Sequence, residues 1–160
     1  MLLLRIPTGA ARAITWFAAV SCGNTFADIT QLTPLSFGTV AVSDNTAVQT
    51  INVTTSGRAY YSSYVHPIED AQRGVYLLSN FPTNQVLSVT TQVISSTSTS
   101  SQASTEQFSL TNVNTTTYIT TDASGEATIY VGGTLSTSGS GSSAFSNTQY
   151  TAQFQITVNY

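Results

Sequence analysis

His66 is the only histidine in the chain, and it lies shortly before two carboxylates, Glu69 and Asp70. An imidazole oriented by a carboxylate can act as the general base for a hydroxyl nucleophile. However, the chain has no Gly-x-Ser-x-Gly turn to present such a hydroxyl, and Pro67 places His66 in a predicted loop. We therefore interpret His66 as a surface histidine and predict that the protein is not an enzyme.

The other polar motifs do not predict a metal or cofactor site. One Cys and one His cannot form a zinc site built on Cys/His clusters. The segment Asp122–Glu126 begins like a calcium loop but lacks a carboxylate at the third position, so it is predicted to be a tight turn. Gly139 and Gly141 do not lie between a strand and a helix, as a phosphate-binding loop would. We expect no cofactor and no metal.

Two further patterns are weak signals of sugar chemistry. Asn52 and Asn114 begin formal glycosylation sequons, which occur by chance in a chain so rich in Asn, Ser and Thr. Tyr60, Tyr61 and Tyr64 can form a stacking patch for a sugar, or they can divide between the core and the sheet surface. The second interpretation of these tyrosines is favoured.

The end of the chain, Tyr150–Tyr160, gives the clearest structural signal. Apolar or aromatic residues alternate there with Thr, Gln and Asn at every position, which is typical of a strand with one buried face. Such a strand is either the last core strand of a sandwich or a pairing edge for another chain. Seven to nine short strands with frequent turns and no helix predict an immunoglobulin-like antiparallel β-sandwich.

Several local predictions accompany this fold. The first strand is expected over 35–42, with Gly38 at a bulge or bend, and Ile51 and Val53 are expected to face the core. Another strand, 58–65, should end at His66 and Pro67, with a charged loop following. The Ser/Thr-rich stretch 95–105 is expected to be an exposed hairpin tip or edge.

Composition limits the partners. Charged residues make up 7% of the chain, and Lys is absent. The acidic balance argues against nucleic acid and anionic lipid as partners. Without Lys, the chain cannot form the Lys–Asn isopeptide bonds that lock some surface pilins.

The first 27 residues are predicted to be a secretory signal peptide. A short basic region with Arg5 and Arg12 precedes an apolar run over 13–20, and small residues precede a cleavage site after Ala27. The run is too short to span a membrane. A lipid anchor on Cys22 is the less favoured alternative, because the usual Leu of a lipoprotein box is missing. The predicted domain organisation is a signal peptide (1–27), an N-terminal arm (28–34) and a sandwich domain (35–160).

Four segments carry a family resemblance: Leu35–Val40 (LSFGTV), Arg73–Pro82 (RGVYLLSNFP), Val131–Leu135 (VGGTL) and Phe154–Tyr160 (FQITVNY). Together they resemble a bacterial domain-of-unknown-function family of small secreted β-sandwich proteins. That family is similar to spore coat U and archaic chaperone–usher pilin subunits. The resemblance implies an incomplete sandwich whose open groove is filled first by a periplasmic chaperone and then by a strand of the next subunit.

The resemblance also implies the residues of the groove. Phe37, Val40 and Val42 would line one wall and Phe154, Ile156 and Val158 the other, the arm would contribute Ile29 and Leu32, and a chaperone would grip the carboxylate of Tyr160. On a straight strand only one of the two arm residues can point inward, since their positions have opposite parity.

These observations predict a structural subunit of a bacterial surface fibre, with other subunits, a periplasmic chaperone and an outer-membrane usher as partners. The predicted location is the periplasm in transit and then the cell surface. The alternative is a monomeric secreted sandwich that binds a surface or a carbohydrate.

Overall fold

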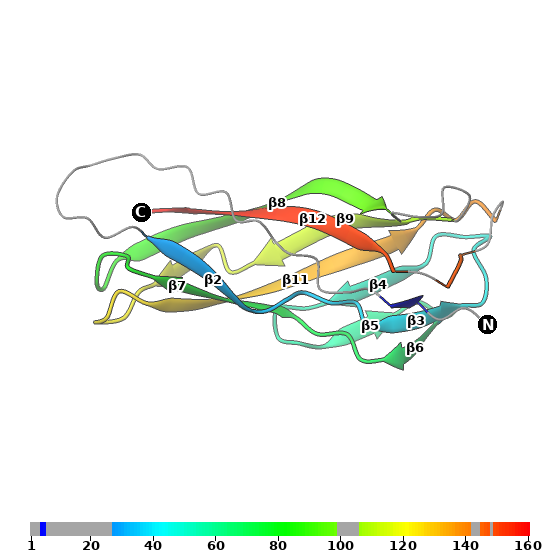
Figure 1. Ribbon diagram of the computed structural model, residues 1–160, viewed down its shortest axis with the longest axis horizontal. Helices are drawn as coiled ribbons and strands as arrows, with labels where there is room; N and C mark the ends of the chain where they lie inside the picture. Colours follow the sequence, from blue (N-terminus) through cyan, green and yellow to red (C-terminus); the bar gives the residue numbers. More distant parts are fainter. Residues whose placement is uncertain (1–3, 6–26, 99–105, 142–144, 148) are drawn as a thin grey trace.

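The structure is a computed structural model that describes residues 4–5, 27–98, 106–141, 145–147 and 149–160. Within these residues all pairings are antiparallel and there is no helix (Figure 1). The strands are β1 (Leu4–Arg5), β2 (Asp28–Thr33), β3 (Thr39–Val42), β4 (Thr50–Val53), β5 (Ala59–Tyr61), β6 (Val65–Glu69), β7 (Gly74–Ser79), β8 (Val86–Ser98), β9 (Phe108–Thr115), β10 (Tyr118–Thr120), β11 (Ala127–Thr137) and β12 (Thr151–Asn159). The prediction of an all-β, sandwich-like antiparallel fold is confirmed.

Much of the predicted signal peptide lies outside the described residues, and so do Cys22 and residues 99–105 of the Ser/Thr-rich stretch. Among the described segments, none is a helix with the length and hydropathy needed to cross a membrane.

The first strand region is a long ribbon formed by residues 28–42 against residues 65–79. β2 pairs with β7, Ser36 bridges to Gln72, and β3 pairs with β6. Gly38 lies between the two halves with a φ of 73°. A Cβ at this position would stand 2.2 Å from the Glu69 carbonyl oxygen, so the bend requires glycine. The predicted bend at Gly38 is therefore present. The predicted strand over 35–42 is a strand only from Thr39 to Val42, as β3, and β2 lies in the predicted arm.

β11 is the central strand of the molecule. β9 pairs along one of its edges, while β7 and then β4 share the other edge, and β5 pairs with β4. The strand runs without a break through Gly132 and Gly133. A Cβ on Gly132 would lie 2.4 Å from the Val53 carbonyl oxygen, so glycine allows the neighbouring backbone to approach closely.

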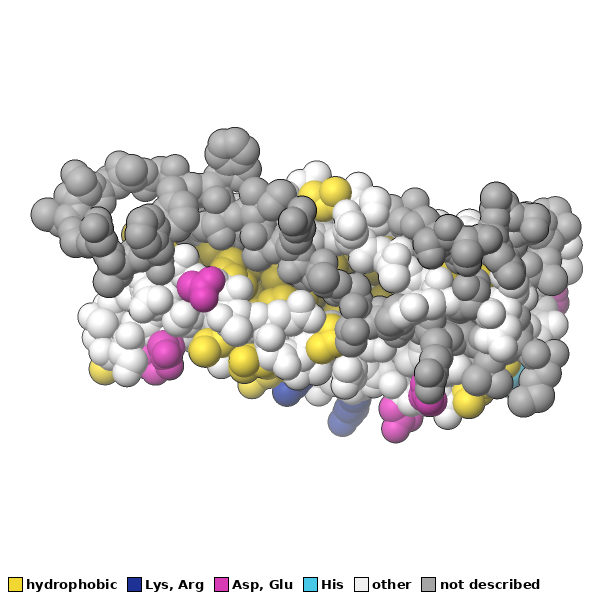
Figure 2. Space-filling view, in the orientation of Figure 1, with side chains coloured by type: hydrophobic (Ala, Val, Ile, Leu, Met, Phe, Trp, Pro, Cys, Tyr) yellow, Lys and Arg dark blue, Asp and Glu magenta, His cyan; other side chains and the backbone are white. Residues whose placement is uncertain are grey.

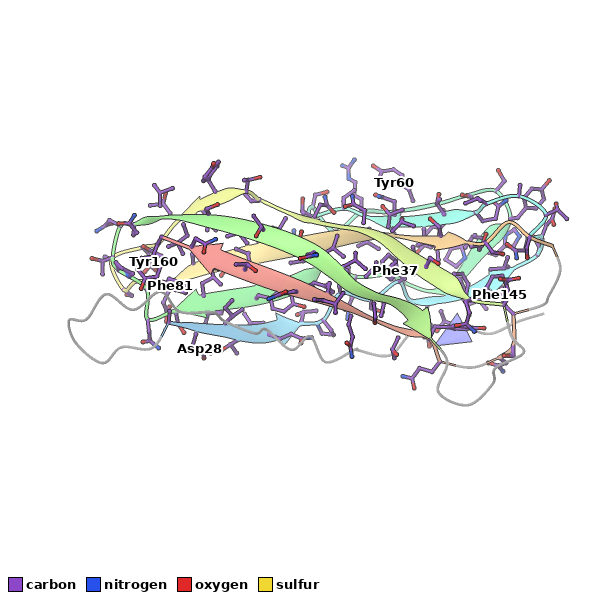
Figure 3. All side chains as sticks on the ribbon, turned by 90° about the horizontal axis from the view of Figure 1, so that it is seen from above. Asp28, Phe37, Tyr60, Phe81, Phe145 and Tyr160 are labelled. Carbon is purple, nitrogen blue, oxygen red and sulfur yellow. The ribbon has the colours of Figure 1, made fainter. Side chains whose placement is uncertain are left out.

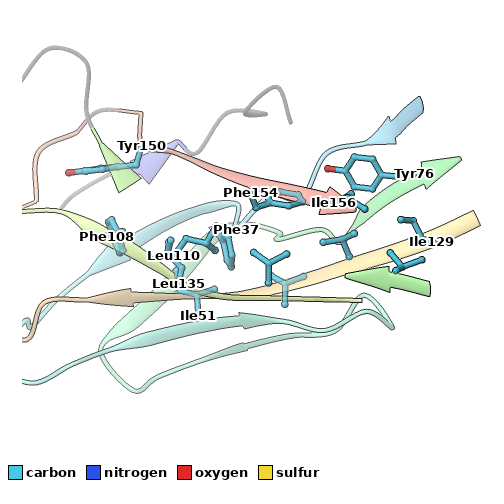
Figure 4. Close-up of a cluster of buried hydrophobic side chains, with 14 of the residues drawn as sticks. Phe37, Ile51, Tyr76, Phe108, Leu110, Ile129, Leu135, Tyr150, Phe154 and Ile156 are labelled. Carbon is cyan, nitrogen blue, oxygen red and sulfur yellow. The ribbon is translucent and has the colours of Figure 1, made fainter. Parts of the chain in front are cut away.

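β8 forms the other layer with β12 and β10. The Thr91 Oγ1 of β8 donates a hydrogen bond to the Val113 carbonyl of β9 at 2.7 Å, which joins this layer to the strand beside β11. Apolar side chains from both layers fill the space between them (Figure 4). The predicted inward positions Ile51 and Val53 are almost fully buried, and their orientation is confirmed.

The segment after Tyr61 differs from the prediction. Residues 65–69 form strand β6, although His66 and Pro67 were expected to end a strand and begin a loop. The prediction is wrong because, among the described strands, β6 pairs only with β3. On such an edge, the missing N–H of Pro67 leaves no hydrogen bond unmade. β8 runs from Val86 to Ser98, so it includes the first residues of the Ser/Thr-rich stretch.

Candidate strand-pairing seam

The first and last strands of the domain are both edge strands. Among the described strands, β2 pairs only with β7 and β12 pairs only with β8. We call the border between residues 28–42 and β12 the seam. Figure 1 shows β2 and β12 along the same long side of the molecule, and Figure 2 shows apolar side chains at the surface in this region.

β12 supplies one wall of the seam. Phe154 and Ile156 are buried, and Val158 is partly buried against the same core. The residues between them are Gln and Thr and are more exposed, so the alternation seen in the sequence corresponds to the two faces of the strand. The Phe154 ring packs edge-on against Tyr76 of β7, with 6.3 Å between ring centroids.

The other wall contains the three residues that the resemblance implied. Phe37 and Val40 are buried, and Val42 is partly buried against the core. A Cβ on Gly133 would lie 3.3 Å from the Phe37 ring, so Gly133 makes room for this side chain. Both predicted sets of wall residues therefore contact one common core.

The predicted arm, residues 28–34, begins with β2 and pairs with β7 from Asp28 to Thr33. Ile29 packs against the core, while Leu32 is 56% exposed. The register shifts between Gln31 and Thr33, so Leu32 is the extra residue of a bulge. The structure thus brings Ile29 to the core and leaves Leu32 outside, in agreement with their opposite parity.

Tyr160 lies at the end of the same wall. Its side chain is 66% exposed, and its ring packs edge-on against Phe81 with 5.8 Å between centroids. Figure 3 shows the two rings next to each other at one end of the molecule. The residue therefore leaves a polar, accessible group at the end of β12.

The edge of β3 that faces away from β6 carries a short strand. β1 pairs there, with Leu4 opposite Val40 and Arg5 opposite Thr39. In Figures 1 and 3, β1 lies between β3 and the beginning of β12. Residues 4–5 therefore occupy this edge of β3.

Tyr76 is a seam residue that the sequence did not identify. It is 2% exposed, and its hydroxyl is buried without a hydrogen-bond partner. Burial raises the pKa of this hydroxyl to about 12, since the phenolate would lose its hydration. The sequence signal was only its inward position in the alternating segment Gly74–Ser79, which is equally typical of a plain core residue.

The candidate catalytic and calcium-binding residues, His66 and Asp122, are not part of the seam. His66 is exposed on β6, with its Nε2 3.1 Å from the Ser43 Oγ, and no carboxylate bonds to its ring among the described contacts. The Asp122 carboxylate accepts hydrogen bonds from the amides of Ser124 and Glu126 at 2.8 and 2.9 Å, so it closes its own turn. The described residues contain no group of three potential metal ligands.

The three candidate sugar-stacking tyrosines do not share one environment. Tyr60 and Tyr64 are exposed, while Tyr61 is partly buried against the core. A different aromatic contact, between the Arg73 guanidinium and the Tyr130 ring at 3.8 Å, lies on the outer face of the sheet. The Arg73 Nη1 also donates to the Thr55 carbonyl at 2.8 Å, which fixes the turn after β4.

Comparison with known proteins gives one match. A family model described as a domain of unknown function, DUF4402, matches residues 27–160. No curated protein and no solved structure matches the chain. The match includes β2 together with every later strand, so the arm lies within the family's domain. On this evidence the chain belongs to the DUF4402 family.

Proposed function

We propose that this protein is a structural, non-enzymatic subunit of a bacterial surface fibre, in which a strand from a neighbouring subunit closes the seam. The observation that carries the proposal is that two edge strands, β2 and β12, border one apolar core. The sequence resemblance to spore coat U and archaic chaperone–usher pilin subunits supports the same function.

Strand addition at the seam is energetically reasonable. An incoming strand gains backbone hydrogen bonds from an open edge and buries its inward side chains in the core. Four or five apolar side chains would contribute about 6–12 kcal/mol gross. The ordering cost is about 1–2 kcal/mol per residue. Within residues 28–34 only one of Ile29 and Leu32 can point inward, so the arm gains further apolar anchors only if it extends to Leu35 or Phe37. The pairing of β1 with β3 supports the capacity of this border to take a strand.

The candidate donor in this chain is the arm, residues 28–34. None of the six residues of β2 is fully buried, so releasing β2 from β7 exposes little apolar surface. In the proposed assembly, β2 of one copy leaves its own sheet and pairs with β12 of the next. Before assembly, a periplasmic chaperone would cover the seam and contact Tyr160, and an outer-membrane usher would export the subunit to the cell surface.

Disulfide trapping can test this assembly, since the chain has no cysteine after Cys22. Thr30 lies opposite Leu77 when β2 is in its own sheet, so Thr30→Cys with Leu77→Cys reports that state. For the proposed state, Thr30→Cys is combined in turn with Gln153→Cys, Gln155→Cys and Thr157→Cys, which alternate with the inward residues of β12.

We expect at least one of the β12 combinations to give a ladder of disulfide-linked oligomers on cells that assemble the fibre. The Thr30–Leu77 combination should instead give a cross-linked monomer and block assembly, because β2 can no longer leave. Single-cysteine variants are the control for random oxidation. If every β12 combination gives only monomers and cells carry no fibre that contains the protein, the proposed function is wrong.

A further inference from the structure

The unpaired hydroxyl of Tyr76 is the feature of the seam that the apolar walls do not explain. A buried hydroxyl without a partner costs about 1–3 kcal/mol, and a phenylalanine would fill the same space without that cost. The hydroxyl lies beside the core face of an edge where a strand can be added. The inference that follows rests on the proposed function and concerns the identity of the incoming strand.

The ring of Tyr76 is held in one position. It packs edge-on against Phe154, with an interplanar angle of 86°. A Cβ on Gly74 would be 2.9 Å from the ring, so the ring also lies close over Gly74. Figure 4 shows the Tyr76 hydroxyl pointing along the core toward Phe154 of β12. The Tyr76 hydroxyl is therefore directed at β12, where a strand added at the seam could supply a hydrogen-bond partner.

The chain's own first strand does not supply that group. Gln31 lies opposite Tyr76 in the pairing of β2 with β7, and yet the Tyr76 hydroxyl remains without a hydrogen bond. A hydrogen-bond partner for this hydroxyl would have to come from a strand in a different position or from water. A strand added beside β12 approaches the ring from the side of Phe154, which is the side toward which the hydroxyl points.

We propose that the Tyr76 hydroxyl donates a hydrogen bond to a polar side chain of the strand that closes the seam. Tyr76 would thereby select a strand that carries a polar residue between its inward apolar residues. The first strand of a second copy fits this requirement. Its odd-numbered positions are Ile29, Gln31, Thr33 and Leu35, so two residues with acceptor oxygens lie between two apolar residues. Either Gln31 or Thr33 of that copy is the partner of Tyr76.

Peptide binding tests this selection. The full chain is expressed with its N-terminal segment and purified after export, as the wild type and as Tyr76→Phe. Each protein is titrated with a fluorescent peptide of residues 28–37 and with the same peptide carrying Gln31→Leu or Thr33→Val. Anisotropy gives the dissociation constants. The Tyr76→Phe variant keeps the ring that packs on Phe154, and unfolding curves confirm that it folds.

For the wild type, one of the two substituted peptides should bind about threefold to tenfold more weakly than the parent peptide. This is the change expected from the loss of one hydrogen bond. For Tyr76→Phe, the same substituted peptide should bind at least as tightly as the parent peptide, because no hydroxyl remains to pair with the polar residue. If the peptides bind but their ratios are the same for both proteins, the inferred role of Tyr76 is wrong and the proposed function stands. If no peptide binds and no disulfide ladder forms, the proposed function itself is wrong.

Discussion

β2 and β12 border the same seam, but the domain holds them very differently. β2 has six residues and none of them is fully buried, and Leu32 bulges out of the strand. β12 has nine residues, of which Phe154 and Ile156 are buried in the core. Burial of apolar area is the main source of an edge strand's stability. The comparison indicates that the core holds β12 more firmly than β2, which makes β2 the candidate for exchange in the proposed assembly.

The largest expected loss of stability comes from a substitution in β12. Phe154→Ala removes a buried ring and its contact with Tyr76, and we expect it to lower the free energy of unfolding by about 3–5 kcal/mol. Chemical denaturation of the purified chain measures the change. Phe154→Leu is the matched control and should cost clearly less. A loss below about 1 kcal/mol for the alanine variant would mean that β12 is not a fixed wall.

The second expected effect is a pH dependence of the stability that Tyr76 contributes. The pKa of Tyr76 is raised from 10.0 to about 12 in the folded chain. The unfolded state therefore loses its proton first, and the contribution of Tyr76 to stability declines as pH rises from about 10 through 12. The difference in unfolding free energy between the wild type and Tyr76→Phe should shift by about 2 kcal/mol over this range. A constant difference would show that the hydroxyl is hydrated.

On the β2 side, Ile29→Ala should have a smaller effect. Ile29 is only partly buried, so we expect a loss of about 1–2 kcal/mol, below the range for a fully buried isoleucine. Hydrogen exchange is the sharper measurement, since the amides of β2 should exchange faster than those of β12 in the wild type. Equal protection of the two strands would contradict the comparison.

The smallest effect on stability is expected at Leu32. Leu32→Ser removes an exposed apolar side chain from the bulge, so the free energy of unfolding should change by less than about 0.5 kcal/mol. If the arm is exchanged between copies with Leu32 inward, in place of the register with Ile29 and Gln31 inward, the same substitution should still reduce fibre formation, measured by electron microscopy of cells. Normal fibres with Leu32→Ser would exclude this side chain from the subunit contact.

The fold was predictable from residue alternation because most strands have one buried and one exposed face. The alternation of Tyr150–Tyr160 predicted the inward set of β12, and the segment with Ile51 and Val53 was equally clear. A prediction failed where the pairing of strands, and not the residue pattern of one segment, decides whether that segment is a strand. Pro67 is accommodated within β6 because β6 is an edge among the described strands.

The site was predictable only in part. The family resemblance supplied the wall residues, and the structure brings those of both walls to one core. The pairing of the arm with β7 was harder to predict from the sequence. Nothing in Asp28–Thr33 distinguishes a free arm from an edge strand of the same domain. Tyr76 was missed because a tyrosine at an inward strand position looks like any core aromatic. Its unpaired hydroxyl becomes visible only when the surrounding atoms are known.

The central position of β11 has a consequence for how the chain folds. β4 pairs with β11 through Ile51 and Leu135, and β7 pairs with the same strand through Tyr76 and Ile129. Residues near the beginning of the domain must therefore wait for a strand near its end, and such non-local pairing makes folding slow. During that delay several strand edges are open to aggregation. The topology therefore leaves the edges of the earlier strands exposed until the later strands pair with them.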